Sequence, residues 1–241
     1  MSKIHSAFFI AAAVTGFAAM PSVASAAENE DRWDGCSLGL ETTYNSTTVT
    51  FPNAQPDQDL DGFMVGPALS CRMQLDNNLV VGAGARVAGG DITVYRNDGN
   101  ILDQEATNSG VAALTLEVGY AFEDAYVFAE VGQVWYELEQ REICPDPAAV
   151  QFGWCRPANG YAPYDLSTSE IEEGIIFGVG VEFALSENWS FGARVSYAEL
   201  EGADFTLGPA ANGLNLPVKH VEEHELTQAS VRVSRDLWNL F

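Results

Sequence analysis

The stretch "GVGVEFALSENWSFGARVSY", residues 178–197, decides the fold of this chain. Before its centre, bulky apolar side chains take every second position, at Val179, Val181, Phe183 and Leu185. Such a period of two is typical of a strand with one apolar face. "SEN", at residues 186–188, has the composition of a tight turn, and the alternation resumes after it in "WSFGARVSYA". The stretch therefore predicts two antiparallel strands joined by a hairpin.

The same alternation returns along the chain, for example in "LVVGAGARV" (79–87) and "LTLEVGYAF" (114–122). We expect eight strands, at 36–51, 63–75, 79–94, 111–122, 126–140, 175–185, 189–206 and 226–236. Short turns at 76–78, 123–125 and 186–188 alternate with long polar connections near 52–62, 95–110, 141–174 and 207–225. Alternating short and long connections indicate an up-and-down arrangement of neighbouring strands.

The choice between a soluble sandwich and a membrane barrel depends on which face is apolar. One face of these strands carries Leu, Val, Ile and aromatic residues, and the other carries Gly, Ala, Ser and Thr with single charges. A small barrel in lipid places bulk outside and small or polar residues inside. The pattern predicts an all-β fold, an eight-stranded antiparallel transmembrane β-barrel. Aromatic residues next to the short turns predict an interfacial belt, formed by Trp33, Tyr120, Phe122, Tyr126 and Trp189.

The N-terminus and the charge set further limits. Residues 1–26 have the charged start, short apolar run and small-residue cleavage pattern of a secretory signal peptide, so we expect the barrel to occupy 27–241. Later apolar stretches are too short and interrupted for a transmembrane helix of about 20 residues. The formal net charge of −23 argues against a nucleic-acid partner, which calls for clustered Lys and Arg.

Several segments carry a family resemblance. "WDGCSLGLETTY" (33–44), "GFMVGPALSC" (62–71), "VAALTLEVGYAF" (111–122), the opening stretch and the terminal Phe241 together resemble the OmpA-like, porin-like eight-stranded outer-membrane barrels of Gram-negative surface antigens. The resemblance implies insertion into the outer membrane by its assembly machinery, short turns in the periplasm, long loops outside, and a structural or surface-interaction role. In "VRVSRDLWNLF" (231–241), however, Arg235 and Asn239 fall on the lipid-facing parity. Either the strand ends near Ser234, or the terminal signal is weak.

Inward parity collects four carboxylates and four guanidiniums in the lumen. They are Glu41, Arg72, Arg86, Glu117, Glu130, Glu182, Arg194 and Arg232. Such a set is either an ion pathway or a paired network that fills a lumen only as wide as side chains. We favour the filled lumen, because balanced charges can pair with one another whereas an unpaired buried charge is very costly.

The four cysteines of an exported chain predict disulfides, for which three connectivities exist. Barrel geometry favours Cys36 with Cys71 across neighbouring strands, and Cys144 with Cys155 within the longest outer loop. A structural zinc site is the less favoured reading, because the cysteines lack CxxC spacing and the histidines lie far away in sequence.

Two loop clusters suggest ligands. "QPDQDLDGF" (55–63) places Asp57, Asp59 and Asp61 at alternate positions, as calcium loops do, but the twelfth position is Ala68 rather than a bidentate Glu. We expect at most a weak calcium site at an outer hairpin tip, and no other cofactor. "KHVEEHE" (219–225) offers His220, Glu222, Glu223 and His224, but no Ser or Cys is near in sequence.

The leading hypothesis is therefore a non-enzymatic outer-membrane barrel that supports the envelope and presents loops outside. Its partners would be outer-membrane lipid, lipopolysaccharide and an extracellular ligand of the acidic loops. The alternatives are a narrow porin-like channel and an outer-membrane lipid-modifying enzyme.

Overall fold

The computed structural model describes residues 32–49, 58–97, 103–144, 164–202, 204–205, 219–220 and 224–237. The expected signal peptide, 1–26, lies outside these ranges. In the part of the chain that they cover, no helix is long and apolar enough to cross a membrane.

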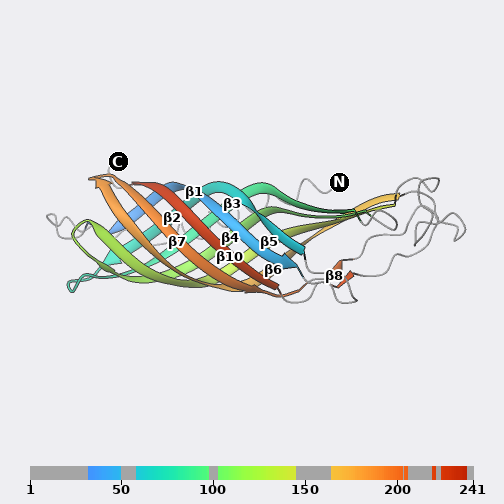
Figure 1. Cartoon of the computed structure of the whole chain (residues 1–241). Coiled ribbons are helices and arrows are strands. Elements are labelled where there is room, and N and C mark those ends of the chain that lie inside the picture. The colour runs from blue at the N-terminus through green and yellow to red at the C-terminus, as the bar shows by residue number, and fades with distance from the viewer. Residues whose placement is uncertain are drawn as a thin grey trace, which may run out of the picture.

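Eight antiparallel strands close into a tilted barrel (Figure 1), which confirms the predicted fold. The barrel strands are β1 (Gly35–Val49), β2 (Gln58–Gln74), β3 (Leu79–Asn97), β4 (Asp103–Ala121), β5 (Ala125–Cys144), β6 (Tyr164–Ser186), β7 (Trp189–Leu200) and β10 (His224–Asp236). Each barrel strand pairs with the barrel strands that come before and after it in the chain, and β1 pairs with β10 to close the ring. Closure leaves no strand edge unpaired in the hydrocarbon, where unmet backbone groups cost several kcal/mol each.

Several predicted strand ends were wrong, mostly because the strands are longer than expected. Residues 103–110 and 164–174, predicted as loop, belong to β4 and β6, and 58–62 belongs to β2. The seventh strand is shorter, since β7 ends at Leu200. Beyond it a separate two-stranded ribbon forms from β8 (Asp204–Phe205) and β9 (Lys219–His220). The barrel wall therefore continues well past the predicted strands at the end away from the short turns.

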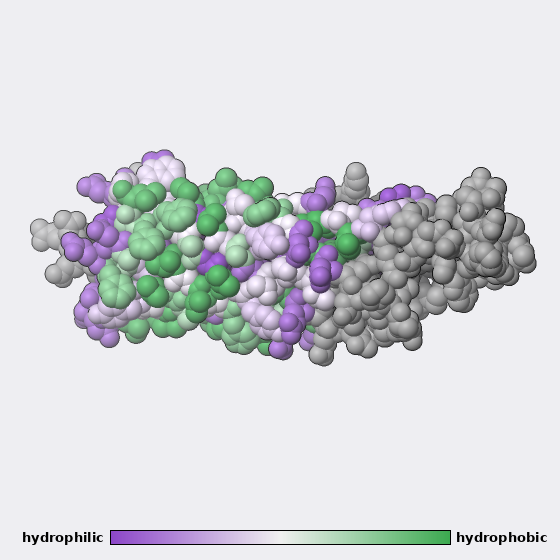
Figure 2. Space-filling model, viewed as in Figure 1, coloured by the Kyte–Doolittle hydropathy of each residue, from purple (hydrophilic) through white to green (hydrophobic). Residues whose placement is uncertain are grey.

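In the strand residues beyond the predicted ends, the inner face is the more apolar one and the outer face is polar, which is the reverse of the rest of the barrel. This reversal explains why the sequence pattern did not reveal these residues as strand. In the half of β5 nearest the short turns, Val127 and Val131 face outward and Glu130 is buried inside. Farther along, Val134, Tyr136 and Leu138 are buried inside, and the outward positions include Glu137, Glu139 and Arg141. Figure 2 shows the result as an apolar belt bounded by hydrophilic residues at the short-turn end and again past the middle of the molecule.

Two adjacent β-bulges lie where the polarity changes. The pairing of β3 with β4 shifts between Gly89 and Ile92, and that of β4 with β5 shifts between Asn108 and Gly110. A bulge inserts an extra residue and changes which side chains face inward. In β4 the buried positions are odd-numbered from Val111 onward and even-numbered at Ala106 and Asn108. A single parity therefore could not be extended through this strand.

The last strand includes the residue that broke the expected pattern. β10 runs to Asp236, which pairs with Ser37, so the strand ends where the predicted range 226–236 placed its end, two residues beyond Ser234. Arg235 lies exposed on the outer face, with its guanidinium carbon 5.8 Å from the centre of the Trp189 ring. This rim position lets the charge stay near water while it contacts an aromatic face. Asn239 and Phe241 lie outside the described residues.

Candidate functional site

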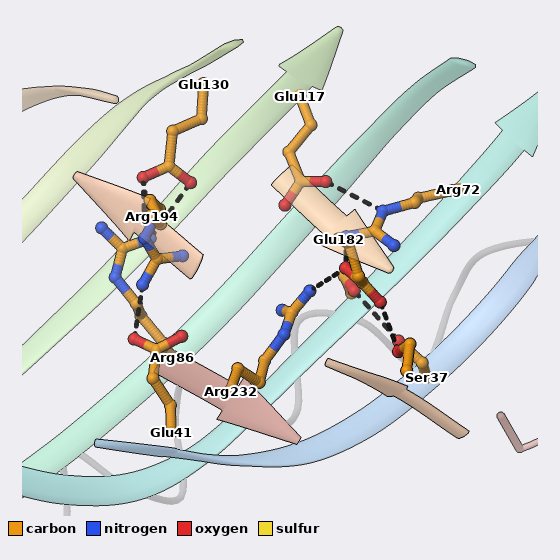
Figure 3. A network of polar contacts seen from close by, with 11 residues as sticks. Ser37, Glu41, Arg72, Arg86, Glu117, Glu130, Glu182, Arg194 and Arg232 are labelled. Carbon is orange, nitrogen blue, oxygen red and sulfur yellow. Dashed lines mark hydrogen bonds and ion pairs between the residues drawn. The ribbon is translucent and has the colours of Figure 1, made fainter. Parts of the chain in front are cut away.

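The lumen holds two groups of ion pairs, each with two glutamates and two arginines (Figure 3). In the first group, Arg194 pairs with Glu41, and its Nε lies 3.4 Å from Oε1 of Glu130. Arg86 completes this group, with Nη1 3.2 Å from the Glu130 carboxylate. Its four members come from β1, β3, β5 and β7.

The second group is built around Glu182. The Oε2 atom of Glu182 accepts hydrogen bonds from Nη2 of Arg72 at 2.8 Å and from Nη2 of Arg232 at 2.6 Å. Arg72 also donates from Nε to Oε2 of Glu117 at 3.0 Å. Ser190 donates to the other oxygen of Glu182 at 2.5 Å. The charged members come from β2, β4, β6 and β10, the strands that the first group leaves out.

This division between alternate strands follows from barrel geometry. Strands in a closed barrel are tilted and staggered, so inward side chains from alternate strands reach the same level and form layers. Each layer here has two positive and two negative side chains, and all eight are 9% exposed or less. The structure thus brings together every lumen residue named from inward parity. Ser190, which supports Glu182, was missed because the expected set included only charged residues.

The short-turn end of the lumen is closed by aromatic side chains. Trp33 and Tyr126 are both buried, with ring centres 5.6 Å apart, and Phe128 stacks on Tyr126 at 5.2 Å. The guanidinium of Arg72 lies 4.6 Å from the Tyr126 ring centre, so this aromatic group contacts the ion pairs directly. The prediction that Trp33 and Tyr126 belong to the interfacial belt was wrong. Tyr126 shares parity with Glu130, and this signal already indicated an inward side chain.

A short N-terminal segment fixes Trp33 in the mouth of the barrel. Trp33 donates from its indole Nε1 to the carbonyl of Phe122 at 3.4 Å. The neighbouring Arg32 donates to Asp124 and to the carbonyl of Ser186, both at 2.9 Å. Residues 32 and 33 thus connect the turn between β4 and β5 with the end of β6.

The other side of the ion pairs is closed by polar and then apolar layers. Gln228 donates to Asn45 at 2.7 Å and accepts from Ser196 at 3.3 Å, all three buried. Farther from the short turns, a cluster of buried apolar side chains fills the interior of the barrel where the strands continue beyond the apolar belt. It consists of Leu60, Met64, Ile92, Ala106, Val111, Ala113, Val134, Tyr136, Leu138, Ile176, Ala198, Leu200 and Leu226.

The space left beside the charged side chains is small. A cavity at the mouth, lined by Arg72, Glu182 and Trp33, measures about 20 Å³, and another beside Glu41 and Arg194 measures about 10 Å³. A single water needs roughly 10–15 Å³ of such volume. These cavities therefore hold on the order of one water each, not a column of water.

The cysteine predictions have different outcomes. Cys36 and Cys71 are directly opposed on β1 and β2 and form a disulfide, as predicted. The side chain of Cys144 and the whole of Cys155 lie outside the described residues, so their pairing stays a prediction.

The proposed calcium residues are only partly described. Asp59 and Asp61 lie in β2 rather than in a hairpin tip, so that placement was wrong. The strand continues here because Asp59 and Asp61 stay exposed while Leu60 between them is buried. Asp59 accepts a hydrogen bond from Thr48 at 2.9 Å, and Asp57 lies outside the described residues. Within the ranges that the structure covers, no group of three or more His, Cys, Asp or Glu side chains is arranged to hold a metal.

Most of the histidine cluster, residues 219–225, lies outside the described residues. The backbone of His220 is in β9 and that of His224 begins β10, while Glu222 and Glu223 are outside the described ranges. The side chains of the two histidines are likewise not described.

With the barrel and its filled lumen established, comparison with known proteins places the chain. The family model described as "Outer membrane protein beta-barrel domain" matches residues 9–219. The chain belongs to this family. It is therefore an outer-membrane protein, as its location was predicted to be. No curated protein matches the sequence.

The chain aligns with several solved structures over nearly the whole length of each, but the sequence identities are low. OprG from Pseudomonas aeruginosa is 13% identical, with a TM-score of 0.47, covering 84% of this chain and 95% of that one. Ail, the attachment invasion locus protein of Yersinia pestis, is 12% identical, with a TM-score of 0.44 and coverages of 84% and 98%. The outer membrane protease OmpT from Escherichia coli is 10% identical, with a TM-score of 0.41 and coverages of 85% and 97%.

Proposed function

We propose that this family member is a non-enzymatic barrel that contributes to envelope integrity and presents a polar outer surface for contacts. The observation that carries the proposal is the filled lumen, with an aromatic layer, two neutral ion-pair layers and an apolar layer in series. Breaking such a buried network costs several kcal/mol, so it favours a fixed interior over a path for solutes.

The extended wall supports the surface role. Beyond the apolar belt, the outer face of β3 to β6 carries Asp91, Glu105, Glu139, Asp165 and Arg141. Arg141 donates to Asp165 at 2.7 Å and to Glu105 at 3.1 Å, which holds part of this acidic face in one arrangement. An acidic surface is suited to a basic ligand or to cation-bridged contact with lipopolysaccharide phosphates.

The test is conductance of the purified protein in planar lipid bilayers. We expect no steady, large open-channel current, whereas a porin reconstituted in parallel supplies the positive control. A stable open-channel current carried by the wild-type protein would reject the filled-lumen proposal in favour of the narrow channel.

The lipid-modifying alternative has a separate test. Membrane lipids from cells with and without the protein are compared by thin-layer chromatography, and we expect identical patterns. A new lipid species that disappears in a His220→Ala variant would instead identify the protein as an enzyme.

A further inference from the structure

The strand β6 loses one of its two neighbours where it leaves the apolar belt. It pairs with β5 along its whole length, but its ladder with β7 ends at Gly174, opposite Leu200. One further backbone bond follows, from the amide of Glu201 to the carbonyl of Glu173 at 2.8 Å. Among the described residues, the stretch 164–172 then has a paired strand on one side only. Its other side is a free sheet edge.

The bond to Glu173 shows which backbone groups face this edge. In an antiparallel strand the N–H and C=O of one residue point to the same side, and those of the next residue point to the opposite side. The ladder with β5 has no register shift here, so the alternation is regular. The direction of the Glu173 carbonyl is therefore shared by every second residue before it, namely Asp165, Ser167, Ser169 and Ile171. We call residues 165–171 the β6 edge; it offers hydrogen-bond donors and acceptors over about 20 Å.

The β6 edge lies outside the hydrocarbon, at the end of the molecule far from the short turns, where Figure 1 shows the gold start of β6. Ile171 is the farthest apolar residue from those turns among the outward-facing residues of β6, and Ser169, Ser167 and Asp165 follow it. In the hydrocarbon, unpaired backbone groups would cost several kcal/mol each. Beyond the belt water can satisfy them until another strand takes its place.

The β6 edge lacks the features that usually protect a free edge. Such edges commonly carry a bulge, a proline or a lysine. Residues 165–171 include neither proline nor lysine, and their ladder with β5 has no bulge. After Glu201 the chain does not continue along β6, since β8 pairs with β9 in a separate ribbon. The edge of β3 is different, because a bulge follows Gly89 and a Cβ atom at Gly62 of β2 would lie 2.8 Å from Ile92.

The side chains around the β6 edge are acidic. Asp165 and Glu170 are exposed on β6, and Glu139 lies on the neighbouring β5. Opposite charges on paired strands stabilise a ladder, and like charges oppose it. A second copy of the chain would bring the same net charge of −23. In one membrane its β6 would also run in the same direction, so the antiparallel pairing used throughout the barrel could not form.

We propose that the β6 edge binds an extended, basic segment of an extracellular polypeptide, which adds as an antiparallel strand in the place that β7 leaves open. Strand addition takes its affinity from backbone hydrogen bonds and its specificity from the alternating side chains. Lysine or arginine in the added strand would lie beside Asp165 and Glu170. The inference rests on the surface role proposed above and specifies the ligand's chemistry and its site.

Binding of a fluorescent peptide to the purified protein in lipid nanodiscs tests the proposal, with anisotropy as the readout. The probe is Thr-Lys-Val-Lys-Val-Lys-Thr, and the same peptide with glutamate in place of lysine is its control. We expect Ser169→Pro to weaken binding by about tenfold or more, because proline removes an N–H that faces the free edge and is not used by β5. Ser169→Ala keeps this N–H, so it is the matched control and should bind within about twofold of the wild type.

Hydrogen exchange followed by mass spectrometry separates strand addition from charge attraction alone. The basic peptide should slow exchange of the backbone amides in 165–171, because edge N–H groups that face water become paired. The wild type and Ser169→Ala should both show this protection, and Ser169→Pro should not. Peptide binding without any protection of 165–171 would overturn the proposal.

A heat-modifiable shift on gels shows whether each variant is folded, and Ser167→Pro replaces Ser169→Pro if the latter fails to fold. Equal binding by the proline and alanine variants would overturn the β6 edge as the site and leave the acidic surface of the proposed function intact. No binding to the wild type, or equal binding of the glutamate peptide, would reject a basic strand as the ligand. A dimer that Ser169→Pro abolishes would assign the edge to a second copy instead. None of these outcomes depends on conductance, so the filled lumen is tested separately.

Discussion

At the scale of single residues, Glu182 is the residue that joins the members of the second ion-pair group. It accepts from Arg72, Arg232 and Ser190, so its removal affects three partners at once. Replacing a buried pair by well-packed apolar residues can be neutral, but removing one member leaves an uncompensated charge. The network is therefore more sensitive to single changes than to matched ones.

We expect Glu182→Gln to lower the free energy of unfolding by about 3–5 kcal/mol, because buried Arg232 would lose the carboxylate with which it pairs and Arg72 would keep only Glu117. Denaturant unfolding in detergent micelles measures this difference. Glu187→Gln, in the exposed turn between β6 and β7, is the control and should change stability by about 0.5 kcal/mol or less. Equal midpoints for Glu182→Gln and wild type would contradict the role given to Glu182.

The ion pair between Arg141 and Asp165, on the outer face beyond the apolar belt, leads to a prediction about pH. Hydrogen bonds from Arg141 lower the pKa of Asp165 below its ordinary value of 3.8, so the pair stabilises the extension above that value. The contribution is lost as the pH falls through the lowered pKa of Asp165. We expect Arg141→Gln to raise the pKa of Asp165 toward 3.8, measured by NMR titration of the side-chain carboxyl. An unchanged titration would show that the ion pair is absent in solution.

At the scale of elements, the disulfide fastens the first hairpin of the barrel where β1 begins and β2 ends. Cys36 and Cys71 are separated by 35 residues, and a crosslink of this span stabilises by roughly 4 kcal/mol in the loop-entropy model. We expect Cys36→Ser/Cys71→Ser to lose 2–4 kcal/mol of unfolding free energy, on the order that removal of native disulfides causes.

The comparison requires a background in which Cys144 and Cys155 are both serine, so that only one disulfide is tested. In that background a reducing agent should destabilise the protein with Cys36 and Cys71 and leave the double serine variant unchanged. Equal sensitivity of both proteins to the reducing agent would exclude the disulfide as its target.

The strands within the apolar belt could be predicted from the sequence, whereas their continuations beyond the belt could not. In the belt, lipid outside and a narrow lumen inside give each strand face a single chemistry, so parity correctly predicted inward positions as distant as Glu41 and Arg232. The extensions could not be predicted in this way. Their outer face meets water and their inner face is largely apolar, apart from buried polar residues such as Asn108 and Glu172. The bulge at Ser109 also reverses the parity of β4. The pairing of Gly89 with Gly110 across β3 and β4 is likewise a juxtaposition that only the three-dimensional register reveals.

At the scale of the whole molecule, the barrel has two interiors in series with different sources of stability. Near the short turns, ion pairs fill a lumen whose outer wall contacts lipid. Beyond the belt, an apolar core is surrounded by a polar outer wall, as in a soluble barrel. Hydrophobic burial stabilises the interior of this second part more than that of the first, whose inner apolar cluster is limited to the aromatic layer and its neighbours and whose other bulky side chains face lipid.

This division predicts that the two parts lose stability separately. Leu138 is fully buried in the apolar layer, so Leu138→Ala should cost about 2–5 kcal/mol locally through lost packing and the cavity left behind. Hydrogen exchange followed by mass spectrometry should then speed up in the outer parts of β4 to β6 and stay slow around Glu117, Glu130 and Glu182. Val131→Ala, on the lipid-facing side of β5, is the control and should leave exchange in the extension unchanged. Faster exchange spread evenly along the strands of Leu138→Ala would mean that the barrel unfolds as one unit, because the loss of packing would then reach the ion-pair layers too.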